Sequence, residues 1–233
     1  GTSFCKLIIV CVHPNKAVFF STLDPAMLIS DSNQFVFVHV AKTGGDSIKL
    51  ALWPVSIGPN LSHRSSILRY AGLPRDYRRF RFRVHDTVQR LERQVPAEIY
   101  QRFFKIDYVR NPLDLLVSAY SDRLNRPRRR PGRLFQTTNT FDEYVHFEAR
   151  RGKLFQHKQL AGADGQITLD FIGRFETLQE DFATVCTRLG IGIALPHVNR
   201  THHRPYHQYY DVALRDFVAR HWQRDIEAFG YEY

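Results

Sequence analysis

The segment FVFVHVAKTGGDSIKLAL, residues 35–52, opens as a run of apolar residues and resumes, after a polar break, with helix-like spacing. The continuous apolar run from Gln34 to Val40 is typical of a central strand covered on both faces. The helical pattern extends from about Asp46 to Trp53, and Pro54 ends it. The segment therefore predicts a buried strand that is joined to a helix by a short turn with two adjacent glycines.

This turn carries the residue types of an anion-binding loop. Gly44 and Gly45 let the backbone approach a ligand closely, and the first amides of the following helix add the positive end of its dipole. Lys42 supplies a full positive charge and Ser47 a hydroxyl group. The nucleotide P-loop pattern G-x-x-x-x-G-K-[ST] is not met, because the lysine precedes the glycines. The turn favours a phosphate-like ligand, and a glycine turn with an incidental lysine is the alternative.

The rest of the chain alternates between strand-like and helix-like segments. Further strands are expected at residues 79–86, where RFRFRVHD alternates basic and apolar residues, and at Phe104–Val109 and Leu169–Glu176. A helical region is expected around Leu91–Phe103, with Pro96 near the start of its second part. Further helices are expected from Pro112 with Asn111 as cap, at Phe141–Arg151, from a capping box of Thr177 and Glu180 to Gly190, and at Asp211–Phe229. The alternation predicts a single α/β domain with a central, mostly parallel sheet flanked by helices. Ligands of such sheets bind at the carboxyl ends of the strands, where the glycine turn lies.

Length and composition bound the class of protein. The 233 residues suffice for one well-buried domain, and the apolar and charged fractions of 43% and 24% are those of an ordinary globular protein. We expect the domain to span residues 27–233, after an N-terminal extension, 1–26, whose status the sequence leaves open. The three cysteines lack metal-ligand spacing and form no disulfide framework. No apolar run approaches the ~20 residues that a membrane span needs.

The net charge of +10 favours an anionic partner. Candidates are a nucleic acid, an anionic lipid, an acidic polysaccharide or a phosphorylated cofactor, and a basic surface that serves solubility is the alternative. Basic and aromatic residues interleave at Tyr77–Arg83, but a strand with one wet face explains this pattern, and no recognised nucleic-acid module is present. We therefore expect no nucleic-acid partner.

A second motif, YVRNPLDLLVSAY, places a basic and a hydroxyl side chain after another strand. Arg110 stands at the carboxyl end of this strand, and Ser118 lies on the helix that follows. Asn111 and Ser118 are seven residues apart and therefore share a helix face. An arginine fork with a hydroxyl on that face is suited to a second phosphate. The alternatives are that Arg110 pairs with Asp114 and that Ser118 is an ordinary helical serine.

Together the two motifs resemble those of one family. FVFVHVAKTGGDS is similar to the 5′-phosphosulfate-binding loop of sulfotransferases, and VRNPLDLLVSAY is similar to their 3′-phosphate-binding element. The segments FIGRFETLQEDFATVCTRLGI and LPHVNRTHH, and the RDIEAFGY ending, also resemble this group. The likeness runs from Gln34 to Tyr231 and points to the carbohydrate sulfotransferases of the heparan and chondroitin types and their bacterial relatives. It implies the P-loop-like sulfotransferase fold and transfer of a sulfuryl group from 3′-phosphoadenosine 5′-phosphosulfate (PAPS) to a hydroxyl.

The resemblance also implies which residues bind the donor. They are the loop residues Lys42, Thr43, Gly44, Gly45, Asp46 and Ser47 at the 5′ end, Arg110 and Ser118 at the 3′-phosphate, and Arg174, Arg200 and Thr201 nearby. Asp46 departs from the threonine or serine more usual in the family, and its carboxylate would repel the donor. Arg174 has pairing with Glu176 as its alternative. Sulfuryl transfer needs no metal, and we expect none.

In the mechanism that the resemblance implies, Lys42 neutralises the charge that grows on the bridging oxygen, and a base accepts the proton of the acceptor hydroxyl. His85, at the end of the RFRFRVHD strand, is the candidate base, as a histidine is in the heparan and chondroitin type enzymes. Asp86 could orient its ring or serve as the base itself, and a histidine that only caps the next helix is the alternative. His39, inside an apolar strand, is expected to be a hydrogen-bonded core histidine.

The acceptor is expected to be a hydroxyl on a carbohydrate, and an anionic acceptor could dock on the arginine-rich loop Arg126–Arg133. A solvated basic loop is the alternative. Two other functions remain open: a non-catalytic module that binds a polyanion or nucleotide, and a P-loop-like kinase. The compartment also stays open, since a bacterial enzyme would be cytoplasmic and a eukaryotic ectodomain would lie in the Golgi lumen. The sequence does not indicate an oligomeric state.

Overall fold

The computed structural model describes residues 9–13, 16–19, 27–56, 86–125, 140–196 and 204–232. Its central sheet has the strand order β3-β4-β5-β6, formed by Leu28–Ser30, Phe35–Phe37, Phe104–Val109 and Phe171–Arg174. Strand β3 is antiparallel to β4, whereas β4, β5 and β6 are parallel. The expected α/β domain with a mostly parallel sheet is confirmed. Strands β1 (Ile9–His13) and β2 (Lys16–Phe19) form a separate antiparallel hairpin.

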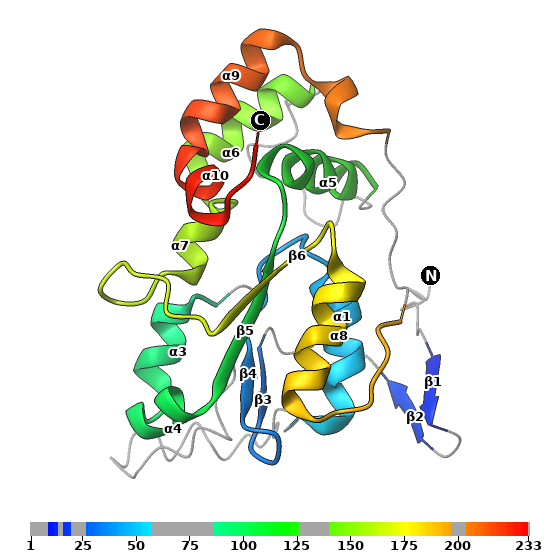
Figure 1. Cartoon of the computed structure of the whole chain (residues 1–233). Coiled ribbons are helices and arrows are strands. Elements are labelled where there is room, and N and C mark those ends of the chain that lie inside the picture. Colours follow the sequence, from blue (N-terminus) through cyan, green and yellow to red (C-terminus); the bar gives the residue numbers. More distant parts are fainter. Residues whose placement is uncertain are drawn as a thin grey trace, which may run out of the picture.

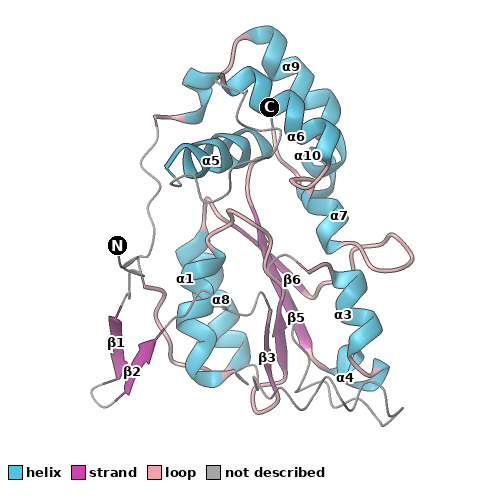
Figure 2. Ribbon diagram, turned by 180° about the vertical axis from the view of Figure 1, so that it is seen from behind, coloured by secondary structure: helices cyan, strands magenta, loops and turns pink. Residues whose placement is uncertain are grey.

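Helices cover both faces of the central sheet (Figures 1 and 2). Their bounds are α1 Gly45–Leu52, α3 Val88–Gln94, α4 Ala97–Arg102, α5 Pro112–Asn125, α6 Phe141–Arg151, α7 Gln156–Leu160, α8 Leu178–Leu189, α9 Val212–His221 and α10 Gln223–Phe229. Two short 3-10 helices, η1 (Trp53–Val55) and η3 (Tyr206–Tyr209), complete the described helices. Helices α1 and α8 lie on one face and α3 on the other (Figure 1).

Alternate residues of β4 point into two different apolar clusters. Phe35 and Phe37 pack with Ile48 of α1 and Phe182 of α8. Val36 belongs to the opposite cluster, with Leu91 of α3 and others. Because successive side chains of a strand point to opposite faces, a strand covered on both faces must be apolar throughout. This explains the uninterrupted apolar run in the sequence.

Helix α5 runs across the carboxyl end of the sheet, and α6, α9 and α10 lie beyond it (Figure 1). A third apolar cluster joins α5, α6 and α9 through side chains such as Leu116, Val145 and Val218. Trp222, between α9 and α10, is fully buried in the same cluster. Helix α5 therefore begins directly after β5 and lies over the carboxyl end of the sheet (Figure 1).

Strand β4 is shorter than the predicted Gln34–Val40. The amide of Val38 still bonds to the carbonyl of Ile106 at 2.9 Å, but the amide of Val40 donates to the side chain of Asp107, at 3.5 Å. At Val40 the Asp107 side chain thus replaces a main-chain carbonyl as the hydrogen-bond acceptor, before the chain turns toward α1. The predicted bounds of β5 and α6 agree with the structure, and β6 is shorter than Leu169–Glu176.

Two helix predictions need correction. Thr177 precedes α8 without a capping box, because its hydroxyl donates to Asp181 at 2.8 Å instead of accepting an amide. The final helix is not continuous from Asp211 to Phe229. It breaks at Trp222, whose indole nitrogen donates to the carbonyl of Leu154 at 3.2 Å. Burial of this large side chain sets the junction between α9 and α10.

The helical region expected at Leu91–Phe103 forms two helices, α3 and α4, on either side of Pro96. Proline lacks the amide that a continuous helix would need at that position. The hydroxyl of Thr87 caps α3 by accepting the amide of Arg90. The expected strand at 79–86 lies outside the described residues except for Asp86, and so does the arginine-rich loop Arg126–Arg133.

Candidate active site

The turn after β4 has a fixed and unusual backbone. The backbone angle φ is 82° at Gly44 and 69° at Lys42, so both residues adopt the left-handed conformation. For Lys42 this conformation is costly, because its Cβ crowds the backbone there. The buried hydroxyl of Thr43 donates to the carbonyl of Val40 at 2.9 Å and closes the turn. Strain of this kind persists where the surrounding structure holds a residue in place.

Both glycines of the turn lie against other side chains. A Cβ atom on Gly45 would lie 1.9 Å from Cδ2 of His39, and one on Gly44 would lie 2.6 Å from a methyl carbon of Leu178. A larger residue at Gly45 would force the buried His39 ring to move. His39 is thus a core histidine that is stacked on Phe37. The His39 ring lies against Gly45 of the turn.

The start of α1 can receive an anion. No side chain caps this helix, and the amides of Ser47 and Ile48 both donate to the carbonyl of Gly44. Within the described part of the chain, the amide of Gly45 has no hydrogen-bond acceptor. A helix start with free amides and the positive end of the helix dipole favours a negatively charged ligand.

Asp46 lies in the first turn of α1 with an exposed side chain. Its carboxylate contacts Nζ of Lys49 at 2.9 Å. Although the side chain is exposed, neighbouring protein atoms remove some water from the carboxylate, which acts to raise the pKa of Asp46, but Lys49, with His39 and Lys42, holds the pKa below its usual value. The carboxylate is therefore ionised and neutralised within the helix, which reduces the repulsion of an anion at the turn.

Arg110 connects the second motif to this turn. Its Nη1 donates to the carbonyl of Lys42 at 3.1 Å, and its Nε donates to Asp114 at 2.8 Å. The guanidinium lies over the ring of Phe175, 3.8 Å from the ring centre. The two motifs, 68 residues apart in sequence at this bond, are therefore in direct contact. The pairing of Arg110 with Asp114, which the sequence offers as the alternative to a phosphate contact, is present, and the same guanidinium also contacts the turn.

The main chain of Arg110 is held by a residue that the sequence reasoning missed. The side-chain amide of Gln156 accepts the Arg110 amide at 2.9 Å and donates to the Arg110 carbonyl at 2.8 Å. Gln156 is fully buried at the start of α7. Its main-chain amide donates to the carboxylate of Asp225, on α10, at 2.8 Å. No spacing in the sequence marks these residues, because each bond joins segments far apart in the chain.

Three polar residues line one face of α5 at intervals of four. They are Asp114, which holds Arg110, Ser118, and Asp122, whose carboxylate lies 3.6 Å from Nζ of Lys42. Ser118 is 1% exposed, and among the described residues its hydroxyl has no hydrogen-bond partner. Asn111 caps the helix, since its side chain accepts the amide of Leu113 at 2.9 Å. The four-residue spacing of Asp114, Ser118 and Asp122 was visible in the sequence, although the sequence reasoning did not use Asp122.

Arg174 lies apart from the turn in its described contacts. Its Nη2 donates to the carbonyls of Phe229 and Gly230, at 2.7 and 3.2 Å, and its guanidinium lies over the ring of Tyr231. Glu176 does not pair with it but accepts the amide of Asn111 and the hydroxyl of Tyr231. The alternative of an Arg174–Glu176 pair is therefore wrong in this structure, and Arg174 is engaged with the C-terminal segment.

Three predicted site residues, His85, Arg200 and Thr201, lie outside the described residues. Asp86, beside the candidate base, is 8% exposed and contacts Arg90 at 2.8 Å. Among the residues that the structure describes, no group of three or more histidines, cysteines or acidic residues could hold a metal ion. None of the described helices is both long and apolar enough to cross a membrane.

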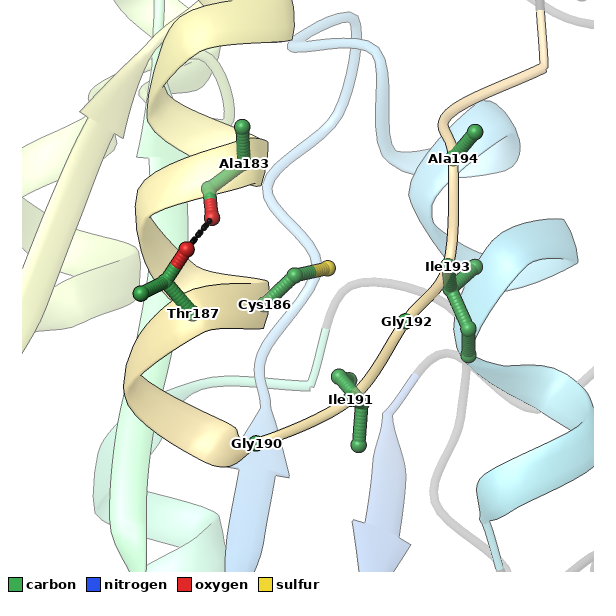
Figure 3. Close-up of a pocket in the computed structure, with 8 residues that line it drawn as sticks. All are labelled: Ala183, Cys186, Thr187, Gly190, Ile191, Gly192, Ile193 and Ala194. Atoms are coloured by element: carbon green, nitrogen blue, oxygen red, sulfur yellow. Dashed lines mark hydrogen bonds between the residues drawn. The ribbon is translucent and has the colours of Figure 1, made fainter.

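A hollow of about 610 Å³ lies beside the C-terminal half of α8 (Figure 3), whereas the glycine turn contacts Leu178, the first residue of this helix. Its lining residues are Ala183, Cys186, Thr187, Gly190, Ile191, Gly192, Ile193 and Ala194. The hydroxyl of Thr187 is occupied by the carbonyl of Ala183, at 2.9 Å, and the lining includes no charged side chain. This hollow therefore does not suit the anion that the turn favours.

The comparisons with known proteins agree with the two motifs. The sequence model of the sulfotransferase family matches residues 25–232. No similar protein was found among curated proteins or among solved structures. The match covers nearly the whole of the structure described above, including the glycine turn, Arg110 and α5. On this basis the chain belongs to the sulfotransferase family.

Proposed function

We propose that this chain transfers a sulfuryl group from PAPS to a hydroxyl group, and we expect this hydroxyl to be on a carbohydrate. The contact of Arg110 with the Lys42 carbonyl supports this proposal most directly, because it joins the two motifs in one site. The residues fit such a donor. The turn offers the Gly45 amide, which has no acceptor among the described residues, and close-packed glycines, and Ser118 offers a buried hydroxyl without a described partner.

The two ends of the donor would be bound by different elements. Residues 42–47 would hold the 5′-phosphosulfate at the start of α1, as anions are held at helix N-termini. Ser118 of α5, with Arg110 beside it, would hold the 3′-phosphate. Asp114 and Phe175 fix the Arg110 guanidinium, so that little conformational freedom is lost when the donor binds.

In the reaction, PAPS supplies the sulfuryl group. Its sulfur forms a bond to the acceptor oxygen while the bond to the bridging oxygen of the phosphosulfate breaks. Lys42 would neutralise the charge that develops on this bridging oxygen. His85, with Asp86 as the alternative, would accept the proton of the acceptor hydroxyl. The net charge of +10 suits an anionic carbohydrate acceptor.

Calorimetry with adenosine 3′,5′-bisphosphate, ATP and NAD tests the donor site. We expect the bisphosphate to bind at least tenfold more tightly than the other two, since Ser118 and Arg110 address a 3′-phosphate. With radiolabelled PAPS and a carbohydrate acceptor, Lys42→Ala and His85→Ala should each lower kcat by about 10²-fold or more. Bisphosphate binding without any turnover would indicate a binding module. Magnesium-dependent ATP consumption would indicate a kinase.

A further inference from the structure

Arg110 and Lys42 are each paired with a carboxylate on the same face of α5. Asp114 contacts Arg110, and Asp122 contacts Lys42, with the buried Ser118 between them in sequence. A donor with phosphate at both ends would meet both pairs. The two carboxylates carry the same charge, so only their geometry can assign them different roles.

The pair of Arg110 and Asp114 is closed. Both Nε and Nη2 of Arg110 lie 2.8 Å from the same carboxylate oxygen, and the two side chains are 7% and 16% exposed. The ring of Phe175 covers the guanidinium on one face. A buried, hydrogen-bonded pair of this kind fixes its members, because separating them would leave a buried charge without a partner.

The pair of Lys42 and Asp122 is open. The distance from Nζ of Lys42 to the Asp122 carboxylate is 3.6 Å, and the two side chains are 22% and 31% exposed. The Lys42 carbonyl is held by Arg110, so the main chain stays in place when the side chain moves. An exposed ion pair contributes little free energy, and a lysine ammonium on its flexible stem can exchange one oxygen ligand for another.

We propose that Asp122 is the counter-ion of Lys42 in the free protein and that the donor's 5′ phosphosulfate displaces it. The inference rests on the proposed donor site. In the free protein the Asp122 carboxylate, on α5, lies 3.6 Å from the Lys42 ammonium. When the donor binds, the ammonium moves from the Asp122 carboxylate to the donor's oxygens. Asp122 acts on the donor through Lys42 and is therefore a positioning residue that opposes donor binding.

The substitution Asp122→Asn tests this competition by calorimetry with adenosine 3′,5′-bisphosphate. Loss of the carboxylate removes both the competing ligand of Lys42 and a negative charge near the anion. We expect binding to become about three- to tenfold tighter. The KM for PAPS should fall without a rise in kcat. A residue with a merely structural role would not produce tighter binding.

Three further variants complete the test. Asp216→Asn, at an exposed position on α9, makes the same change in net charge and should alter the affinity less than twofold. Asp114→Asn should weaken binding, because it frees Arg110. In a Lys42→Ala background, Asp122→Asn should lose at least half of its effect, since the competition requires the ammonium.

The outcomes separate this inference from the proposed function. Tighter binding by Asp122→Asn that depends on Lys42 supports the inference. If the unaltered protein binds the bisphosphate and Asp122→Asn binds it equally or less well, the inference is overturned and the donor site stands. If neither protein binds the bisphosphate, the proposed donor is wrong and the inference falls with it.

Discussion

At the scale of single residues, Asp107 shows how a polar side chain in the central strand supports the site. It is fully buried in β5, and one of its oxygens accepts the amides of Tyr108 and Val40, at 2.6 and 3.5 Å. The other oxygen has no hydrogen-bond partner among the described residues. Asp107 thus accepts an amide that the sheet no longer pairs, at the point where the chain leaves β4 for the glycine turn. Burying its carboxyl group costs free energy.

The burial of Asp107 makes the stability of the fold depend on pH. Burial raises the pKa of this carboxyl well above its ordinary value of 3.8, although the amides of Tyr108 and Val40 act in the opposite direction. Between 3.8 and the raised pKa the folded protein holds a proton that the unfolded chain releases. The free energy of unfolding should therefore decrease as pH rises through this interval.

Urea unfolding of the protein and of Asp107→Asn at several pH values from 4.5 to 8 checks this prediction. The difference in free energy of unfolding between the two proteins should shift in favour of the asparagine variant as pH rises. Asparagine keeps an acceptor for both amides and does not titrate. If the difference in free energy of unfolding stays constant over this range, the pKa of Asp107 is not raised in the folded protein and the prediction is wrong.

At the scale of secondary-structure elements, the short helix α7 links the C-terminal helices to the site. Its five residues are too few to be stable alone. Asp225 of α10 accepts the amides of Gln156 and His157, at 2.8 and 2.9 Å, and also contacts the His157 ring. A carboxylate at a helix start satisfies its free amides and favours its dipole. The anchored helix then presents Gln156 to the main chain of Arg110.

We predict that Gln156→Ala weakens both the fold and the donor site. The substitution leaves the buried amide and carbonyl of Arg110 without their partner, which should lower the free energy of unfolding by about 2–4 kcal/mol. Because Arg110 also bonds the Lys42 carbonyl, the affinity for adenosine 3′,5′-bisphosphate should fall about tenfold.

Gln101→Ala, at an exposed position of α4, is the matched control and should alter both quantities little. Denaturant unfolding and calorimetry on the folded fraction measure the two effects separately. A stability loss with unchanged affinity would mean that Gln156 supports the fold without positioning Arg110.

At the scale of the whole molecule, the C-terminal segment is fastened to the carboxyl end of the sheet. Arg174, the last residue of β6, donates to the carbonyls of Phe229 and Gly230, where α10 ends. Cations and donors at a helix C-terminus satisfy its free carbonyls. Tyr231 adds a bond to Glu176, which in turn accepts the amide of Asn111 at the start of the second motif.

This arrangement predicts that Arg174→Ala lowers stability more than donor affinity. The loss of two hydrogen bonds and of the contact with the Tyr231 ring should lower the free energy of unfolding by about 1–2 kcal/mol. The affinity for adenosine 3′,5′-bisphosphate should change less than threefold. If Arg174→Ala instead loses affinity tenfold while its stability is unchanged, this prediction is wrong. That result would support the nucleotide contact that the sequence suggests for Arg174.

Local sequence determined the elements and the motifs of this protein. The strand Phe104–Val109, the helix Phe141–Arg151 and the glycine turn follow from apolar period, caps and turn residues, which act over a few positions. The expectation that ligands meet the carboxyl ends of the strands follows from the alternation of strands and helices. The failed capping box at Thr177 and the break at Trp222 show where tertiary contacts override such local preferences.

The contacts that hold the candidate site together follow from tertiary packing. The bonds of Arg110 to Lys42 and to Gln156, and of Gln156 to Asp225, span 68, 46 and 69 residues. The carboxylate of Asp122 reaches Lys42 in the same way, from a helix that follows α1, η1, α3, α4 and β5 in the chain. Such pairs depend on how separate elements pack, and hydrogen-bonding capacity alone does not select one distant partner over another. The sequence therefore specifies which groups are available, and packing determines which of them meet.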